Sequence, residues 1–169
     1  MENSRGAYFA VCERRVSMKV ELIPCYTDRK LFLEMARDYI ETLAEFDHSI
    51  RWDEGTWSEY MWESCFILED RTIQGFICKQ EISFKVYADA LYIAEFYVVP
   101  EARGRGVGTA AVEELVRNWN GDVFLYILHE NFAAKVFWGA VEKKLGWRRV
   151  QRPEIRQEPG CELRAFAKQ

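Results

Sequence analysis

The sequence predicts an α/β (α+β) fold, in which a mixed, mostly antiparallel sheet of about six to seven strands carries helices on both faces. Two observations lead to this fold class. Short apolar runs of strand length are interspersed with longer helical patterns, and they follow the order β-αα-βββ-α-β-α-ββ. The chain has 169 residues, of which 49% are hydrophobic, so it is long enough for one domain with a substantial core.

The boundaries of the elements follow from hydrophobic periodicity and from capping residues. Thr27-Asp28 is a capping sequence for the first helix, and Gly146 is placed to end the last one. The expected ranges are a strand over 18–24, a helix over 29–47, a loop and short helix over 48–63, strands over 64–68 and 74–78, a central strand over 91–99, a helix over 108–119, a strand over 123–128, a helix over 132–144, and final strands over 147–150 and 161–167. The packing face expected for the helix over 132–144 consists of Ala133, Val136, Phe137, Ala140 and Val141.

Composition excludes several classes of protein. The net charge of −4 argues against a general nucleic-acid binder, and no apolar run approaches the length of a membrane span. Five cysteines without a Cys-x-x-Cys pair favour neither a disulfide framework nor a metal site, and they suggest a cytoplasmic protein. Residues 1–17 lack periodicity, so we expect an N-terminal extension, either disordered or a non-native start, before a single domain over 18–169.

The most informative stretch is 95–116, where an apolar strand ends at Pro100, a glycine-rich loop follows and a helix begins at once. Glycine lets a backbone approach a pyrophosphate closely, and the helix N-terminus attracts an anion. A P-loop needs a Gly-Lys-Ser/Thr ending, whereas this loop ends Gly108-Thr109-Ala110. A dinucleotide-binding loop needs Gly-x-Gly-x-x-Gly, which differs from the spacing found here. A tight turn without a ligand explains three alternating glycines less well.

The segment 98–108 fits Val-x-Pro-x-x-Arg-Gly-x-Gly-x-Gly at every fixed position. This pattern resembles the acyl-CoA-binding signature of the GNAT superfamily of N-acetyltransferases. The resemblance covers roughly residues 18–167 and implies acetyl-CoA as the donor, central strands that splay apart, and pantetheine contacts along the central strand. It implies CoA contacts by Phe96, Tyr97, Val98, Arg103, Gly104, Arg105, Gly106, Val107, Gly108 and Thr109. For Arg103 and Arg105, solvated loop charges are the alternative to phosphate ligands.

A second segment, from Asn131 to Trp138, is similar to the family's Asn-x-x-Ala-x-x-x-Tyr. The resemblance adds Asn131, Ala134, Phe137 and Trp138 to the implied CoA contacts. In the family the tyrosine protonates the departing CoA thiolate. Trp138 replaces it here, and an indole N–H is a donor without useful acidity. The sequence therefore leaves the general acid open.

Catalysis by direct attack of an amine on the acetyl carbonyl requires a base, and Glu95 on the central strand is the candidate. A structural carboxylate paired with a basic neighbour is an equally good interpretation of Glu95. Tyr97, Tyr126 or water is the expected source of the thiolate's proton. Tyr126 and His129 are weaker candidate bases, and His129 is better interpreted as a loop histidine.

The acceptor is the least determined part of the site. The resemblance places acceptor binding on the first two helices, where Trp52, Asp53 and Trp57 provide aromatic and acidic groups suited to a cationic amine. Packing tryptophans and solvated acids are the alternative interpretation, which we favour. A small-molecule amine and a peptide amine both fit, no metal is expected, and a homodimer is an expectation from the resemblance alone. A non-catalytic CoA-binding module and an interaction protein with the same fold are the competing functions.

Overall fold

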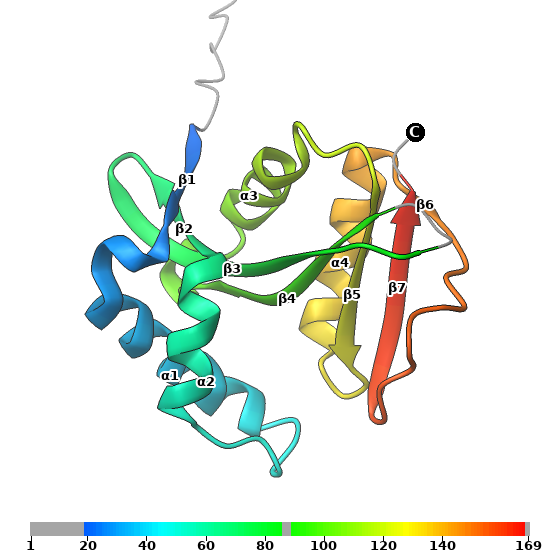
Figure 1. Cartoon of the computed structure of the whole chain (residues 1–169). Coiled ribbons are helices and arrows are strands. Elements are labelled where there is room, and N and C mark those ends of the chain that lie inside the picture. Colours follow the sequence, from blue (N-terminus) through cyan, green and yellow to red (C-terminus); the bar gives the residue numbers. More distant parts are fainter. Residues whose placement is uncertain (1–18, 86–88, 168–169) are drawn as a thin grey trace, which may run out of the picture.

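The fold is a seven-stranded sheet with helices on both faces, in a computed structural model that describes residues 19–85 and 89–167 (Figure 1). The expected extension over 1–17 lies outside the described residues. The strand order is β1-β2-β3-β4-β5-β7-β6, and every neighbouring pair is antiparallel except β4 and β5. The elements are β1 (Val20–Pro24), α1 (Arg29–Ala44), α2 (Glu54–Tyr60), β2 (Ser64–Glu69), β3 (Thr72–Ile82), β4 (Ala90–Val98), α3 (Val107–Val116), β5 (Asp122–Leu128), α4 (Phe132–Leu145), β6 (Arg148–Arg149) and β7 (Cys161–Ala167). The predicted fold class is confirmed.

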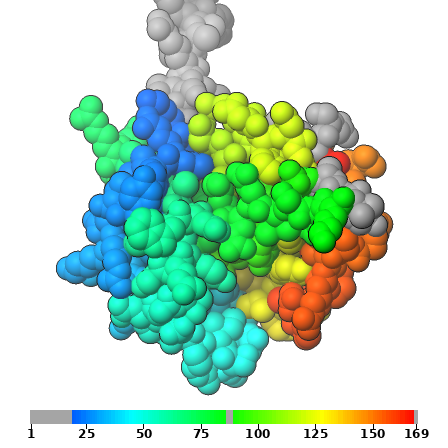
Figure 2. All heavy atoms as spheres, viewed as in Figure 1, coloured from blue at the N-terminus to red at the C-terminus, as the bar shows by residue number. Residues whose placement is uncertain are grey.

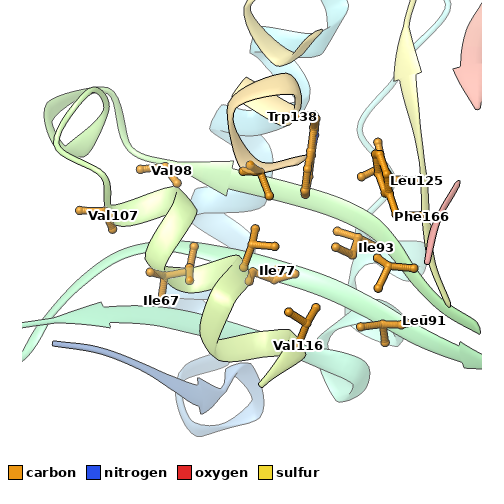
Figure 3. Close-up of a cluster of buried hydrophobic side chains, with 14 of the residues drawn as sticks. Ile67, Ile77, Leu91, Ile93, Val98, Val107, Val116, Leu125, Trp138 and Phe166 are labelled. Atoms are coloured by element: carbon orange, nitrogen blue, oxygen red, sulfur yellow. The ribbon is translucent and has the colours of Figure 1, made fainter. Parts of the chain in front are cut away.

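Two cores lie on opposite faces of the sheet. Under α3 and α4 the core is mainly aliphatic, although it includes Trp138, Trp147 and Phe166, and its members come from β1, β2, β3, β4, β5, β7 and both helices (Figure 3). Under α1 and α2 the core is rich in aromatic rings, among them Phe32, Trp57, Phe66 and Phe76. A third, smaller group of buried residues joins the starts of β4 and β5 to the segment before β7.

The predicted caps are present, but the predicted packing face of α4 is only partly correct. The Asp28 side chain accepts a hydrogen bond from Leu31 N, and Gly146 ends α4 with a φ of 63°. Val136, expected in the core, is 74% exposed, whereas Trp138 is buried. Val141 is buried and Phe137 packs against the core, as predicted, whereas Ala133 and Ala140 are exposed. The buried face of α4 is therefore rotated toward Trp138.

A β-bulge in β4 determines which face its later residues occupy. Cys78 pairs with Glu95 and Lys79 pairs with Ile93, so Ala94 is an extra residue opposite β3. Side chains alternate between faces along a strand, and Glu95 would otherwise share the α3/α4 face with Ile93. The extra residue reverses the alternation, so that Glu95 and Tyr97 face α1 and α2.

The parallel strands β4 and β5 pair at one end and separate at the other. Pairing is confined to Ala90–Tyr92 of β4 and Asp122–Phe124 of β5. Beyond these residues β5 continues with β7 as its partner, and Figure 1 shows these two strands turned away from the direction of β3 and β4. The main-chain groups of β4 from residue 93 onward therefore have no partner in β5.

Candidate functional site

The loop between β4 and α3 presents its backbone at the N-terminus of a helix. Gly104 and Gly106 have φ of 73° and 91°, a region that L side chains rarely adopt. Gly106 is the N-cap residue of α3, and its carbonyl accepts from Ala110 N at 3.0 Å. The N–H groups of the first turn have no intrahelical acceptor, so they form a site for an anion such as a phosphate.

The two arginines of this loop bond inward rather than toward open solvent. Arg103 Nε donates to the carbonyl of Val98 at 2.8 Å, and its guanidinium lies 5.7 Å from the centre of the Tyr97 ring. Arg105 forms an ion pair with Glu69, whose side chain is nearly buried on β2. Both side chains therefore hold the loop against the sheet.

A cavity of about 540 Å³ lies beside this loop, between α1, the end of β4, α3 and α4. It collects most of the residues for which the sequence implied CoA contacts. The side chains of Arg105 and Val107 do not line it, because Arg105 is paired with Glu69 and Val107 is buried in the core. The predicted residues that line the cavity are Phe96, Tyr97, Val98, Arg103, Gly104, Gly106, Gly108, Thr109, Asn131, Ala134, Phe137 and Trp138.

Aromatic rings form one wall of this first cavity. Phe96 stacks on Phe137 with ring centres 5.1 Å apart and meets Trp138 edge to face at 5.4 Å. A Cβ atom at Gly108 would lie 3.0 Å from the Phe137 ring, so any larger residue here would require that ring to shift. Asn131 is the N-cap of α4, and its side-chain oxygen accepts from Ala134 N at 3.0 Å.

A second cavity of about 360 Å³ lies on the other side of the separation between β4 and β5. Its wall includes Ile50, Glu95, Tyr126 and Glu158. Figure 2 shows the yellow atoms of the β5–α4 region between the cyan segment before α2 and the orange and red C-terminal segment, which is where these walls meet. Six residues line both cavities and mark their junction: Tyr39, Leu43, Phe96, Asn131, Ala134 and Trp138.

Glu95 carries the most strongly perturbed carboxyl group of this site. It lines the second cavity, and its Oε2 accepts a hydrogen bond of 2.7 Å from the Tyr39 hydroxyl. Burial raises the pKa of Glu95 to about 7, although the hydrogen bond from Tyr39 opposes this shift. A carboxyl group with this pKa accepts and returns a proton readily near neutral pH.

The other candidate acids and bases lie in different places. Tyr97 lines the first cavity only, and burial raises its pKa. Tyr126 lines the second cavity only, and its hydroxyl donates to the carbonyl of Arg156. His129 lines neither cavity, and its backbone N–H donates to the carbonyl of Gly160.

The three acceptor candidates lie outside both cavities. Asp53 is the N-cap of α2, where its side chain accepts from Thr56. Trp57 is buried in the aromatic core, and Trp52 stacks on it with 6.3 Å between ring centres. These contacts account for all three residues structurally.

The resemblance placed acceptor binding on the first two helices, but sequence reasoning named none of the α1 residues that line the cavities. Tyr39, Thr42, Leu43 and Phe46 lie on this helix or just after it and line the first cavity. Their spacing was visible as part of the helix's apolar stripe, which predicts packing equally well. Because the stripe extends past the edge of the core, its later residues meet the cavities instead.

The described residues contain no group of three histidine, cysteine or acidic side chains placed to hold a metal ion. Within the same residues, no helix has both the length and the apolar character needed to cross a membrane.

The loop, the cavities and the separated strands agree with a comparison to known families. The acetyltransferase (GNAT) family pattern matches residues 24–146, most of the chain. The chain belongs to the GNAT family. Among curated proteins, none matches this GNAT chain significantly in sequence.

Solved structures share the fold at low sequence identity. An acetyltransferase from Thermus thermophilus is 15% identical with a TM-score of 0.61, covering 88% of this chain and 96% of its own. Arabidopsis thaliana Naa50, in complex with the bisubstrate analogue CoA-Ac-MVNAL, is 19% identical with a TM-score of 0.53, covering 89% and 98%. Ard1 from Thermoplasma volcanium is 18% identical with a TM-score of 0.56, covering 89% and 96%. These similarities establish the GNAT fold of this chain.

Proposed function

We propose that this GNAT protein is an acetyl-CoA-dependent N-acetyltransferase, which transfers an acetyl group to a primary amine by direct attack in a ternary complex. The main support is that two cavities meet where β4 and β5 separate, and that Glu95 lies beside this junction. Donor and acceptor would approach from opposite sides and react where the cavities meet. Naa50 in complex with a bisubstrate analogue supports this arrangement.

Acetyl-CoA would occupy the first cavity. The N–H groups at the start of α3 would bind its pyrophosphate, and Phe96, Phe137 and Trp138 would pack against pantetheine. The main-chain groups of β4 that β5 leaves unpaired would hydrogen-bond pantetheine as a neighbouring strand does.

The amine would occupy the second cavity, where Glu95 and Glu158 provide negative charge. The ammonium group would first lose a proton to solvent, and the neutral nitrogen would attack the carbonyl carbon to form the C–N bond. Glu95 as the carboxylate would take the proton that the attached nitrogen must then lose. Collapse of the tetrahedral intermediate would break the C–S bond with its electron pair leaving on sulfur. Holding the two groups in contact would supply much of the acceleration.

Two measurements test the proposal. Calorimetric titration with acetyl-CoA should show saturable binding, which Gly106→Val should weaken at least about tenfold because valine resists a positive φ and covers the N–H groups. Thiol release from acetyl-CoA should then accelerate with at least one member of a panel of putrescine, spermidine, tyramine, free lysine and a tetrapeptide with a free N-terminus. Absence of binding would overturn the proposal.

The alternative is a CoA-binding module without catalysis, which is favoured by tryptophan at position 138, where the family commonly has tyrosine. Saturable binding of acetyl-CoA without thiol release across the whole panel would support this alternative. A raised pKa for Glu95 argues against it, since a buried carboxyl group without a function costs stability.

A further inference from the structure

We propose that Tyr39 delivers the proton to the departing CoA thiolate and receives a replacement from Glu95, so that the two residues form a relay between the two cavities. This inference rests on the proposed acetyl transfer and assigns the general acid that Trp138 cannot provide. The relay would return to the thiolate the proton that Glu95 takes from the amine.

Tyr39 is distinguished from the other candidate proton donors by its position between the two cavities. Six residues line both cavities, and Tyr39 is the one among them with a titratable side chain. The other five are leucine, phenylalanine, asparagine, alanine and tryptophan, whose side chains do not exchange protons at ordinary pH. We call the first cavity the donor cavity and the second the acceptor cavity. A proton that passes through a side chain from the acceptor cavity to the donor cavity would therefore pass through Tyr39.

The Tyr39 ring is held so that its hydroxyl meets Glu95. It packs edge to face on Trp57 and Phe76, with ring centres 6.1 Å and 5.8 Å away, and against Tyr97 at 5.7 Å. The hydroxyl donates to Glu95 Oε2 at 2.7 Å. Such a part-buried, directed hydrogen bond between two titratable groups is the geometry that a relay requires.

The surroundings of Glu95 leave it free to change charge. The titratable groups that face it are Tyr39 from α1, Tyr60 from α2, Cys78 from β3, Tyr92 from β4 and Cys161 from β7, while Tyr126 and Glu158 line the same cavity. None of these groups is a cation. Burial raises the pKa of Glu95 to about 7, below that of an ordinary thiol, so protonated Glu95 is the stronger acid.

The proton balance closes over one turnover. The neutral amine attacks the carbonyl carbon and forms the C–N bond, Glu95 as the carboxylate takes the proton that the attached nitrogen loses, and the C–S bond breaks. The Tyr39 hydroxyl proton then passes to the sulfur while the Glu95 carboxyl proton passes to the Tyr39 oxygen. Tyr39 ends neutral, Glu95 ends as the carboxylate, and CoA leaves as the thiol. Burial and the Glu95 charge raise the pKa of Tyr39, which disfavours a lasting phenolate and favours a concerted transfer.

The competing tyrosines lack one of the two connections. Tyr97 lines the donor cavity, but the acceptor cavity does not include it. The Tyr126 hydroxyl already donates to the carbonyl of Arg156 and lines the acceptor cavity alone.

The test is a double-mutant cycle on Tyr39→Phe and Trp138→Tyr, with the best acceptor of the amine panel. Phenylalanine keeps the ring contacts, and the thermal midpoint and the acetyl-CoA Kd of each variant check that the site persists. Tyr60→Phe is the matched control, because it removes a nearby hydroxyl that lines neither cavity. We expect Tyr39→Phe to lower kcat at least about tenfold with the KM for acetyl-CoA little changed, and Tyr60→Phe to leave kcat unchanged.

Rescue separates a proton donor from a residue that only orients Glu95. Trp138→Tyr supplies a hydroxyl at the same junction, so it should raise kcat far more in the Tyr39→Phe background than in the wild type. An equal effect in both backgrounds, or a full rate in Tyr39→Phe, would overturn the relay. A wild-type protein that releases no thiol with any amine would overturn the proposed function itself, and it would do so before any variant is measured.

Discussion

The two ends of the β4–β5 strand pair differ in whether the strands are hydrogen-bonded to each other. At the paired end, Ala90–Tyr92 bond to Asp122–Phe124, and Tyr92 stacks on Phe124 with 4.8 Å between ring centres. At the open end, from residues 93 and 125 onward, the strands separate, two cavities meet and a half-buried carboxyl group faces one of them.

Stability and function are therefore concentrated at opposite ends of the β4–β5 strand pair. The paired end satisfies its backbone groups and buries its side chains, as any sheet does. The open end leaves main-chain groups without a strand partner and retains a carboxyl group whose pKa is raised by burial. Such features cost stability and are typical of functional sites. The comparison predicts that substitutions at the two ends affect different measurements.

The largest expected effect is on the rate of Glu95→Gln at the open end. Removing a general base typically costs about 10²–10⁴-fold, so we expect kcat/KM to fall at least about a hundredfold. The wild-type rate should rise with pH up to about 7 and level off above it, because the carboxylate is the active form. The variant should lack this rise, and the exposed Glu101→Gln serves as its control. A variant that keeps its full rate across the pH range would refute the assignment of Glu95.

The next largest effect is on stability at the paired end. Phe124→Ala removes a buried ring that lines neither cavity, and we expect a loss of about 3–4 kcal/mol in the free energy of unfolding. The kcat of the folded protein should stay close to that of the wild type. Phe137→Ala at the open end should mainly raise the Kd for acetyl-CoA. Denaturant unfolding and calorimetry on both variants test the contrast, which fails if both lose stability and affinity alike.

A third effect is a gain in the free energy of unfolding, whereas most substitutions lower it. Burial holds the pKa of Glu95 above its unfolded value, so ionisation destabilises the folded state. The penalty is absent below the unfolded pKa and complete above about pH 7. The free energy of unfolding of Glu95→Gln should therefore exceed that of the wild type by about 2–3 kcal/mol near pH 8 and should show no such gain near pH 4. Denaturant unfolding at the two pH values measures this difference. Equal gains at both pH values would mean that ionisation is not the cause.

The smallest expected effect concerns the mouth of the acceptor cavity. Glu158 is exposed and lines this cavity, so it should attract the second charge of a dicationic acceptor. Glu158→Gln should raise the KM for putrescine about two- to fivefold and leave the KM for the singly charged tyramine nearly unchanged. Equal changes for the two amines would contradict an electrostatic role.

The sequence predicts the parts of this protein that depend on local pattern. The glycine loop, the cap at Asp28 and the end of α4 at Gly146 are set by residues within a few positions of one another. The family resemblance from the same loop predicts the fold class, which the structure confirms.

The parts that could not be predicted depend on distant pairing. Simple alternation places Glu95 on the same face as Ile93, and the bulge that separates them exists only in the register between β3 and β4. The contact of Glu95 with Tyr39 joins residues that are 56 positions apart. Part of the α4 face was mispredicted for a related reason. Val136 and Trp138 are both apolar, and the element packed against the helix determines which of the two is buried.

The inward bonds of Arg103 and Arg105 have a thermodynamic consequence. The loop is already fastened to Val98 and Glu69 without a ligand, so little chain entropy remains to be lost when a phosphate arrives. In the proposed complex, phosphate recognition would then be left to backbone dipoles, whose attraction should vary less with ionic strength than that of free guanidinium groups. Acetyl-CoA should accordingly bind this protein with a shallow dependence on salt.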